Sequence, residues 1–283
     1  MESSLRSQKK LPVTIVGAGA VGSALALALD RHGYRIRSLI SKHGKSADRL
    51  GRKVGAGKTG SMSQLRDVSG LLFIAVPDDN IPGVVRYLSR HQTDFSGSIV
   101  FHTSGALASD VLKPLRKNGA SVGSFHPLQT ILRSRVSRND LRNIWIGIEG
   151  DPAAVKAGVR LAKRIGSHPF VLSKKQKVLY HIAAVFSSNY LVTILSVVEE
   201  LGHKIGLPQS TILPMFEPLI LQSVNNVKER TAAVALTGPI ARGDKKTLRR
   251  HHSALGQRGL EEIFKLYKAL ESETMRLTHR KKK

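Results

Sequence analysis

The hydrophobic pattern changes along the chain. In the first half, short continuous apolar runs alternate with segments that carry apolar residues at helical spacing and end in turn residues. Continuous apolar runs are typical of parallel strands covered on both faces, and their alternation with helices predicts β-α-β units in one mostly parallel sheet. Residues 55–59 are predicted to be a loop. The predicted strands are residues 12–16, 35–40, 71–76, 98–102, 121–125, 145–149 and 170–172.

The first strand runs straight into glycines spaced G-x-G-x-x-G, and an apolar helical run follows at residues 24–29. The first glycine lets the chain turn sharply, the second lets the backbone approach a pyrophosphate, and the third lets the helix pack close to the strand. The helix N-terminus offers its N–H groups to the phosphates. The pattern predicts a dinucleotide site, whose expected binding residues are Gly17, Ala18, Gly19, Ala20, Val21 and Gly22.

The end of the second strand bears on the choice of dinucleotide. NAD-selective folds place an acidic residue there to bind the ribose 2′-hydroxyl, whereas this chain has Ser41 and Lys42. A 2′-phosphate favours cations and hydroxyl donors, so the sequence predicts NADP. The alternative is that both residues are solvated loop residues of a basic protein.

Beyond Ser173 the pattern consists of long helical runs, with later helices predicted to begin at Ser210, Asn226 and Lys246. The predicted fold class is α/β: an N-terminal Rossmann domain with a mostly parallel sheet, followed by an all-α domain. The predicted divisions are a polar tail (1–10), a Rossmann-like NADP-binding domain (11–172), a helical substrate and dimerisation domain (173–278) and a basic tail (279–283).

Several polar residues follow the ends of predicted strands. In parallel sheets ligands lie outside the carboxyl ends of the strands, so these residues are expected to face the cofactor and substrate. A role in stabilising turns is the alternative for each residue taken alone. The polar residues are Asp78, Ser104 and His126, after the strands 71–76, 98–102 and 121–125. Val76 and Pro77, beside Asp78, are also expected to bind the cofactor.

A polar stripe runs along the first helix of the helical domain. Lys177, His181 and Ser188 share one face, and Asn189 lies further round. Such a stripe must find partners or face a cleft, and the cleft between the domains is where hydride transfer would need a proton donor. We expect His181 to be that donor, with Lys177 as the other candidate. His126 lies opposite, and Ser104 and Asn189 orient the substrate. A helix face that merely docks onto the sheet is the alternative.

The segment 178–198 carries no Asp, Glu, Lys or Arg, and its length would suit a membrane span. Because it contains polar residues and follows a soluble domain, we expect a helix buried against other helices or a second subunit. This predicts a homodimer formed through the C-terminal domain, and no membrane insertion. Residues 1–10 lack the apolar core of a secretory signal, which predicts a cytoplasmic location.

Composition changes this picture little. The net charge is +25, but the basic residues are spread along the chain and only 5% of residues are aromatic. Nucleic-acid contact is therefore expected to be nonspecific at most. The chain has no cysteine, which excludes disulfides and thiolate metal sites, and we predict no metal.

Four sequence blocks carry a family resemblance: residues 102–106, 124–129, 180–190 and 235–244. They resemble uncharacterised bacterial Rossmann-like oxidoreductases with a C-terminal domain of unknown function. Their superfamily includes ketopantoate reductase, pyrroline-carboxylate reductase and 6-phosphogluconate dehydrogenase. The resemblance implies an NADP-linked domain followed by a helical domain like that of 6-phosphogluconate dehydrogenase. Related dehydrogenases place a catalytic lysine near the start of this helix, but their lysine–asparagine spacing is not kept here.

The resulting functional hypothesis is an NADP-dependent oxidoreductase that acts on a small keto or hydroxy acid. Arg242 is expected to bind a substrate carboxylate beside Asp244, unless the two only fix their own loop. An imine reductase of the pyrroline-carboxylate type is one alternative. The other is an NADP-binding sensor or structural dimer without turnover.

Overall fold

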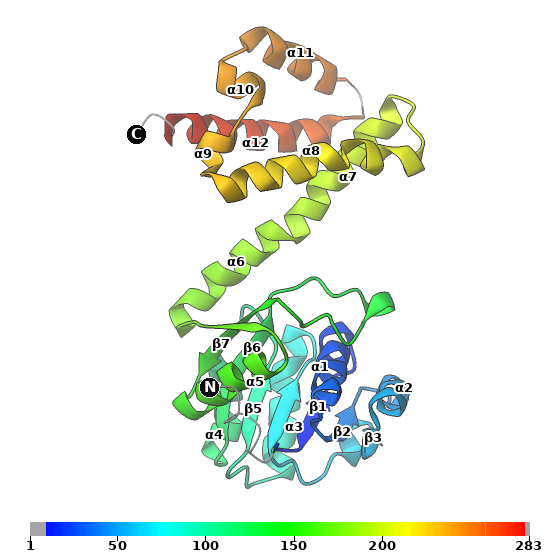
Figure 1. Cartoon of the computed structure of the whole chain (residues 1–283), viewed down its shortest axis with the longest axis vertical. Coiled ribbons are helices and arrows are strands. Elements are labelled where there is room, and N and C mark those ends of the chain that lie inside the picture. Colours follow the sequence, from blue (N-terminus) through cyan, green and yellow to red (C-terminus); the bar gives the residue numbers. More distant parts are fainter. Residues whose placement is uncertain (1–9, 258, 281–283) are drawn as a thin grey trace. The chain divides into compact units, whose positions relative to one another are not determined.

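The computed structural model describes residues 10–257 and 259–280 (Figure 1). The chain divides into two compact units, Met1–Ser188 and Asn189–Lys283. Residues 1–9 of the predicted polar tail and residues 281–283 of the predicted basic tail lie outside the described residues.

The first unit is built on one mostly parallel sheet, as predicted. Within the described residues its order is β3-β2-β1-β4-β5-β6-β7-β8, and β6 and β7 are its antiparallel neighbours. An edge strand, β3, forms where the sequence predicted a loop; it pairs with β2 through backbone hydrogen bonds, which its polar sequence does not reveal. The strands are β1 (Val13–Val16), β2 (Ile36–Ile40), β3 (Lys58–Gly60), β4 (Leu71–Ile74), β5 (Ile99–His102), β6 (Ser121–Pro127), β7 (Trp145–Gly150) and β8 (His168–Val171).

Helices cover both faces of this sheet. Alternate residues of a strand point to opposite faces, so in β4 Phe73 joins the core formed with α1, α2 and α5, and Leu72 joins the core formed with α3 and α4. This sandwich leaves the carboxyl edge of the sheet for ligands. The helices of the first unit are α1 (Ala20–Arg31), α2 (Lys45–Val54), α3 (Ile81–His91), α4 (Lys113–Lys117), α5 (Pro152–Arg164) and α6 (Lys177–Ser187), with short 3-10 turns at 62–64, 78–80, 109–112, 133–135 and 174–176.

The second unit is helical in the described residues, in agreement with the predicted fold class. One prediction within it is wrong: no helix begins at Asn226, because α8 continues through that residue to Glu229. The helices are α7 (Asn189–Lys204), α8 (Gln209–Glu229), α9 (Ala232–Ala235), α10 (Gly238–Arg242), α11 (Lys245–Leu255) and α12 (Glu261–Arg280).

The division between the units falls later than the predicted boundary at Ser173. Helix α6 belongs to the sheet unit, because its first residue, Lys177, is fully buried there. The backbone leaves helical geometry at Ser188 (φ −128°, ψ −71°), so α6 ends at Ser187. Asn189 begins α7 instead of lying further round the helix of His181.

The apolar segment 178–198 spans the division between the units. Leu179, Phe186 and Val192 are 72%, 64% and 63% exposed, and the expected packing of this segment against other helices or a second subunit stays a prediction. Lys174–Lys204 is long and apolar enough to cross a membrane by length and composition, with mean hydropathy 1.6. Core helices of soluble proteins pass the same test, so this property alone assigns no membrane.

Candidate functional site

The glycine loop between β1 and α1 has the geometry that a dinucleotide requires. Gly17 has φ +110°, and a Cβ there would lie 2.1 Å from the Ala75 carbonyl oxygen. At Gly22 a Cβ would lie 1.8 Å from the Gly17 carbonyl oxygen, whereas at Gly19 it would meet no atom within 4 Å. Two glycines are therefore needed by the fold, and the third leaves open space at the start of α1, where a pyrophosphate would approach. Ala20 and Val21 form the first turn of α1.

Polar residues after β4 and β5 meet at the adjoining strand ends. The Ser104 hydroxyl donates to an Asp78 carboxylate oxygen at 2.7 Å and accepts from the backbone N–H of Leu107 at 2.9 Å. Pro77 precedes the 3-10 turn that holds Asp78, and a Cγ of Val76 approaches the Gly17 position. The structure thus brings together the predicted cluster of strand-end residues.

Lys177 does not line an open cleft as the sequence predicted. It is fully buried, and its Nζ donates to the Ser104 carbonyl oxygen at 2.9 Å and to Ser124 Oγ at 2.8 Å. Burial lowers the pKa of Lys177 to about 8, against the opposing effects of Glu149 and Asp78. The lysine joins α6 to the ends of β5 and β6, which makes it a positively charged support beneath the site.

Sequence reasoning missed two buried groups in this network. Glu149 of β7 is 2% exposed and accepts from the backbone N–H and hydroxyl of Ser109, each at 2.8 Å. His102 ends β5, is fully buried, and its Nδ1 accepts from the backbone N–H of Ser104 at 3.2 Å. Both residues lie in predicted strands. A polar residue among the apolar neighbours of a buried strand was the one signal in the sequence that could have marked them as part of the site.

Two histidines converge on Gly105. A Cβ at Gly105 would lie 2.5 Å from Nδ1 of His181 and 2.8 Å from Nε2 of His126. The His181 Nδ1 is buried and has no hydrogen-bond partner in the part of the chain that the structure describes. Both imidazoles therefore pack directly against the Gly105 backbone, and no side chain fits at this position unless the rings shift.

Tyr180 fixes one of these rings. Its hydroxyl lies 2.7 Å from Nδ1 of His126, and its ring packs edge-on against Phe170. Burial raises the pKa of Tyr180 to about 12, so the phenol stays protonated and can donate to His126. Burial, followed by the charge of Lys177, lowers the pKa of His126 to about 4. His126 is thus neutral at pH 7, with its Nε2 facing Gly105.

The buried His102 predicts an acid-sensitive fold. Burial and then Lys177 lower its pKa to about 3 from 6.5, so the unfolded chain binds the proton first as pH falls. Burial of the neutral His102 ring does not weaken the fold above pH 6.5, where the unfolded chain is also unprotonated. The free energy of unfolding falls as pH drops from 6.5 toward 3, because only the unfolded chain binds the proton. At pH 5 the loss of unfolding free energy expected from His102 alone is about 2 kcal/mol, and His126, whose pKa is also lowered, adds to the total. Denaturant unfolding followed by Trp145 fluorescence measures it. His102→Asn should flatten this pH dependence and exposed His43→Asn should not; equal slopes in both would contradict the assignment.

The end of β2 stays available for a cofactor phosphate. Ser41 Oγ accepts from the backbone N–H of Ala47 at 3.2 Å, and Lys42 is exposed. In sequence, no acidic residue stands at Ser41 or Lys42, although Asp48 of α2 lies close to Gly44 in the loop that follows.

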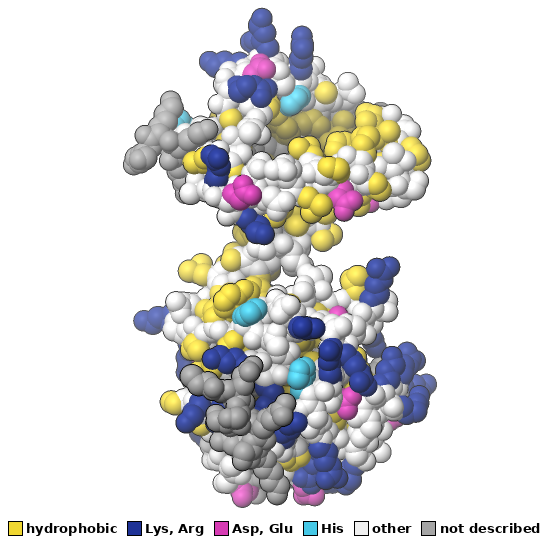
Figure 2. All heavy atoms as spheres, viewed as in Figure 1, with side chains coloured by type: hydrophobic (Ala, Val, Ile, Leu, Met, Phe, Trp, Pro, Cys, Tyr) yellow, Lys and Arg dark blue, Asp and Glu magenta, His cyan; other side chains and the backbone are white. Residues whose placement is uncertain are grey.

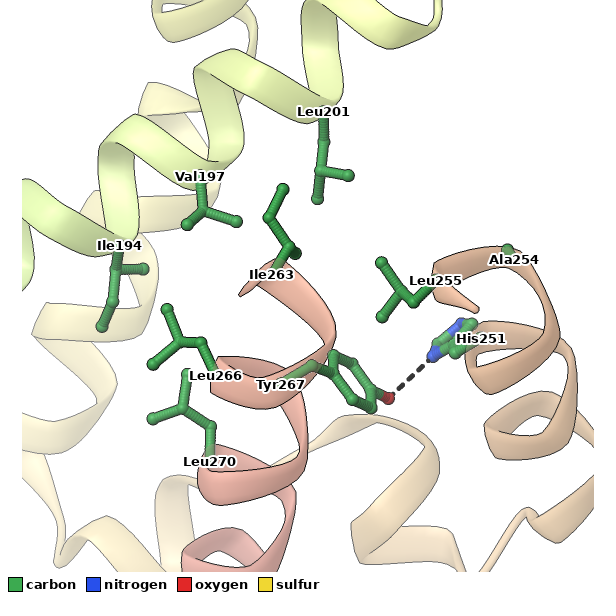
Figure 3. A pocket seen from close by; sticks show the side chains of 10 residues that line it. All are labelled: Ile194, Val197, Leu201, His251, Ala254, Leu255, Ile263, Leu266, Tyr267 and Leu270. Carbon is green, nitrogen blue, oxygen red and sulfur yellow. Dashed lines mark hydrogen bonds between the residues drawn. The ribbon is translucent and has the colours of Figure 1, made fainter. Parts of the chain in front are cut away.

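The remaining predicted site residues lie in the second unit. Asn189 and Arg242 are exposed, and Asp244 is the N-cap of α11, where it accepts from the Thr247 backbone N–H at 3.0 Å. Asp244 therefore stabilises the start of α11, which agrees with the alternative that it fixes its own loop. The same unit contains an apolar cavity of about 360 Å³ among α7, α11 and α12. Figure 3 shows its aliphatic lining and the hydrogen bond between His251 and Tyr267. No group of three metal-binding side chains occurs in residues 10–257 and 259–280.

Two family descriptions match the chain in sequence. Residues 1–127 match a Rossmann-like domain, and residues 144–274 match a domain of unknown function, DUF2520. The two matches together cover most of the chain. The resemblance drawn from the four sequence blocks is confirmed. The sequence matches no curated protein. His126 lies in the Rossmann-like match and His181 in the DUF2520 match, so the histidine pair is formed by both.

Solved structures share the fold over nearly the whole chain. A proposed NADP oxidoreductase from Bacteroides fragilis is 24% identical, and the match covers 94% of this chain and 98% of that one with a TM-score of 0.79. A reductive aminase from Aspergillus terreus, in complex with NADPH and ethyl-5-oxohexanoate, is 17% identical over 95% of each chain with a TM-score of 0.70. An imine reductase from Myxococcus stipitatus, in complex with NADP+, is 14% identical over 95% of each chain with a TM-score of 0.64. At these identities the likeness shows the fold.

Proposed function

We propose that this protein is an NADP-dependent oxidoreductase that transfers a hydride between NADPH and a small keto or hydroxy acid. The observation that carries the proposal is the pair of imidazole nitrogens that converge on Gly105. This pair stands at the strand ends of a sheet whose glycine loop has the shape of a dinucleotide site. NADPH would be held by residues 17–22, with Ser41 and Lys42 favouring its 2′-phosphate, and it would supply the hydride.

The protein residues then have distinct roles. His181 donates a proton to the substrate oxygen from its unpartnered Nδ1, and His126 donates a hydrogen bond from Nε2 to the same atom. Tyr180 holds His126 in the tautomer that leaves this Nε2 protonated. Lys177 holds the Ser104 carbonyl and Ser124 in place and does not contact the substrate.

The charge of the site favours a carbonyl over an imine. The positive charge of Lys177 is felt at His126, where it lowers the pKa. A positive potential stabilises the negative charge that develops on a carbonyl oxygen and attracts a substrate carboxylate, whereas it opposes a cationic iminium carbon–nitrogen bond. Imine reduction is the second candidate, because a reductive aminase and an imine reductase share the fold.

The decisive experiment measures consumption of NADPH, and separately of NADH, with panels of small 2-keto acids and cyclic imines. We expect turnover with keto acids and preference for NADPH. Gly105→Ala should lower turnover by roughly 10²-fold, because its methyl group would overlap both imidazoles and displace them. Ala106→Gly is the matched control. Turnover of cyclic imines but not of keto acids would show that the substrates are imines. NADPH binding without any turnover would indicate a sensor.

The sequence-based expectations for the second unit are also proposals. Arg242 and Asp244 would bind the substrate carboxylate, and Asn189 would orient the substrate. Exposed apolar side chains of α7 and α8, such as Val192 and Leu219, support a homodimer through this unit. Light scattering after size-exclusion chromatography would detect it, and a monomer at micromolar concentration would contradict it. A cytoplasmic location stays a prediction, as does weak, salt-sensitive contact with nucleic acid.

A further inference from the structure

A basic loop crosses the helical face of the sheet unit. We call residues 131–142, which connect β6 to β7, the strap; they belong to the green segment beside α1 in Figure 1. Arg138 binds the Asp30 carboxylate of α1 at 3.1 Å, and Asn139 accepts a hydrogen bond from Arg31. Arg133 donates to Ser46 Oγ of α2 at 3.2 Å. These links to two helices hold the strap in a defined position.

A pocket of about 320 Å³ lies between the strap, α1 and α2. Its polar lining consists of three cations and three hydroxyls, and no carboxylate lines it: Arg49, Lys53, Arg133, Ser23, Ser46 and Ser134. In the described part of the chain, no carboxylate lies within ion-pair distance of these three cations. Figure 2 shows Lys and Arg side chains gathered over the region of α2.

We propose that this strap pocket binds a phosphate monoester. Arginine guanidinium groups bind phosphate through two parallel hydrogen bonds, and serine hydroxyls donate to the remaining oxygens. Asp30 of α1 is already paired with Arg138, and Asp140 within the strap accepts hydrogen bonds from Ser137, so neither carboxylate is among the residues that line the pocket. The volume suits a phosphate together with part of a sugar.

The phosphate group that the pocket binds is either the 2′-phosphate of NADPH or a free phosphate. The pocket favours the first, because Ala18 of the glycine loop also lines it. That assignment rests on the proposed function. The assignment adds Arg49 and Arg133 to the residues that determine cofactor specificity. Arg49 lies shortly after the β2 end in sequence, whereas Arg133 comes from the strap and is not part of the dinucleotide fingerprint.

The test compares Arg133→Ala and Arg49→Ala with Arg135→Ala, an exposed strap arginine that does not line the pocket. Dissociation constants for NADPH and NADH are measured by fluorescence at one fixed ionic strength, and binding of inorganic phosphate by phosphorus NMR. We expect the two pocket variants to weaken NADPH binding about ten- to a hundredfold, while NADH binding stays within about twofold. Arg135→Ala should change neither constant.

The other outcomes separate the hypotheses. If the pocket variants no longer bind inorganic phosphate but still prefer NADPH to NADH, the pocket is a phosphate site whose ligand is a free phosphate. If wild type binds phosphate in this pocket but no dinucleotide, the proposed function fails and the pocket stands. If the pocket variants behave like Arg135→Ala toward both NADPH and phosphate, the strap pocket is not a phosphate site.

Discussion

Replacement of His181 by alanine is expected to lower turnover by about 10²–10⁴-fold, while the affinity for NADPH stays nearly unchanged. The imidazole Nδ1 is the unpartnered buried donor beside Gly105, so the variant loses proton transfer to the substrate oxygen. It keeps the glycine loop and the support from Lys177, which are separate from this side chain. Steady-state kinetics with the substrate found in the panel, together with NADPH titration, measure both effects.

His91→Ala is the matched control, because His91 is an exposed residue of α3 in the same unit. Near-wild-type turnover of His181→Ala would remove His181 from the mechanism. A higher KM with an unchanged kcat would instead indicate that His181 binds the substrate without transferring a proton.

Alanine substitutions at two glycines of the same loop should have opposite consequences. In Gly22→Ala the new methyl group would overlap the Gly17 carbonyl oxygen, so we expect loss of several kcal/mol of stability, about the scale of severe overpacking. In Gly19→Ala the methyl group meets no protein atom and φ is −79°, so the fold should persist. NADPH binding should nevertheless fall by at least about tenfold, because the methyl group stands where the pyrophosphate approaches.

Thermal unfolding and NADPH titration of both variants test this pair. A stable Gly22→Ala protein would show that α1 can move away from β1. A Gly19→Ala protein with unchanged NADPH affinity would show that the dinucleotide does not approach the backbone at this point, and it would count against the proposed cofactor site.

The sheet and its glycine loop could be predicted from the sequence because their signals are local. A continuous apolar run and a fixed glycine spacing each lie within a few residues, so β1, the turn at Gly17 and the start of α1 follow from one short segment. The strand ends at Asp78 and Ser104 were predicted for the same reason, and their mutual hydrogen bond follows from the topology of a parallel sheet.

The remaining parts of the site depend on partners far away in the sequence. Glu149 is satisfied by Ser109, and Lys177 by Ser104 and Ser124, and no local pattern names such partners. The helical stripe correctly placed Lys177 and His181 on one face of α6. It could not show that the lysine enters the sheet while the Nδ1 of the histidine faces Gly105. The end of α6 at Ser188 has no glycine or proline to signal it.

The two faces of strand β6 have different roles: one contributes to the candidate site and the other to the hydrophobic core. Ser124 binds Lys177 and His126 faces Gly105, while Phe125 between them packs on Phe73 and Phe101 in the core. Insertion or deletion of one residue within β6 would exchange these faces, since strand side chains alternate. The protein would then lose its core and its site together. Length variation is therefore expected to be eliminated within β6.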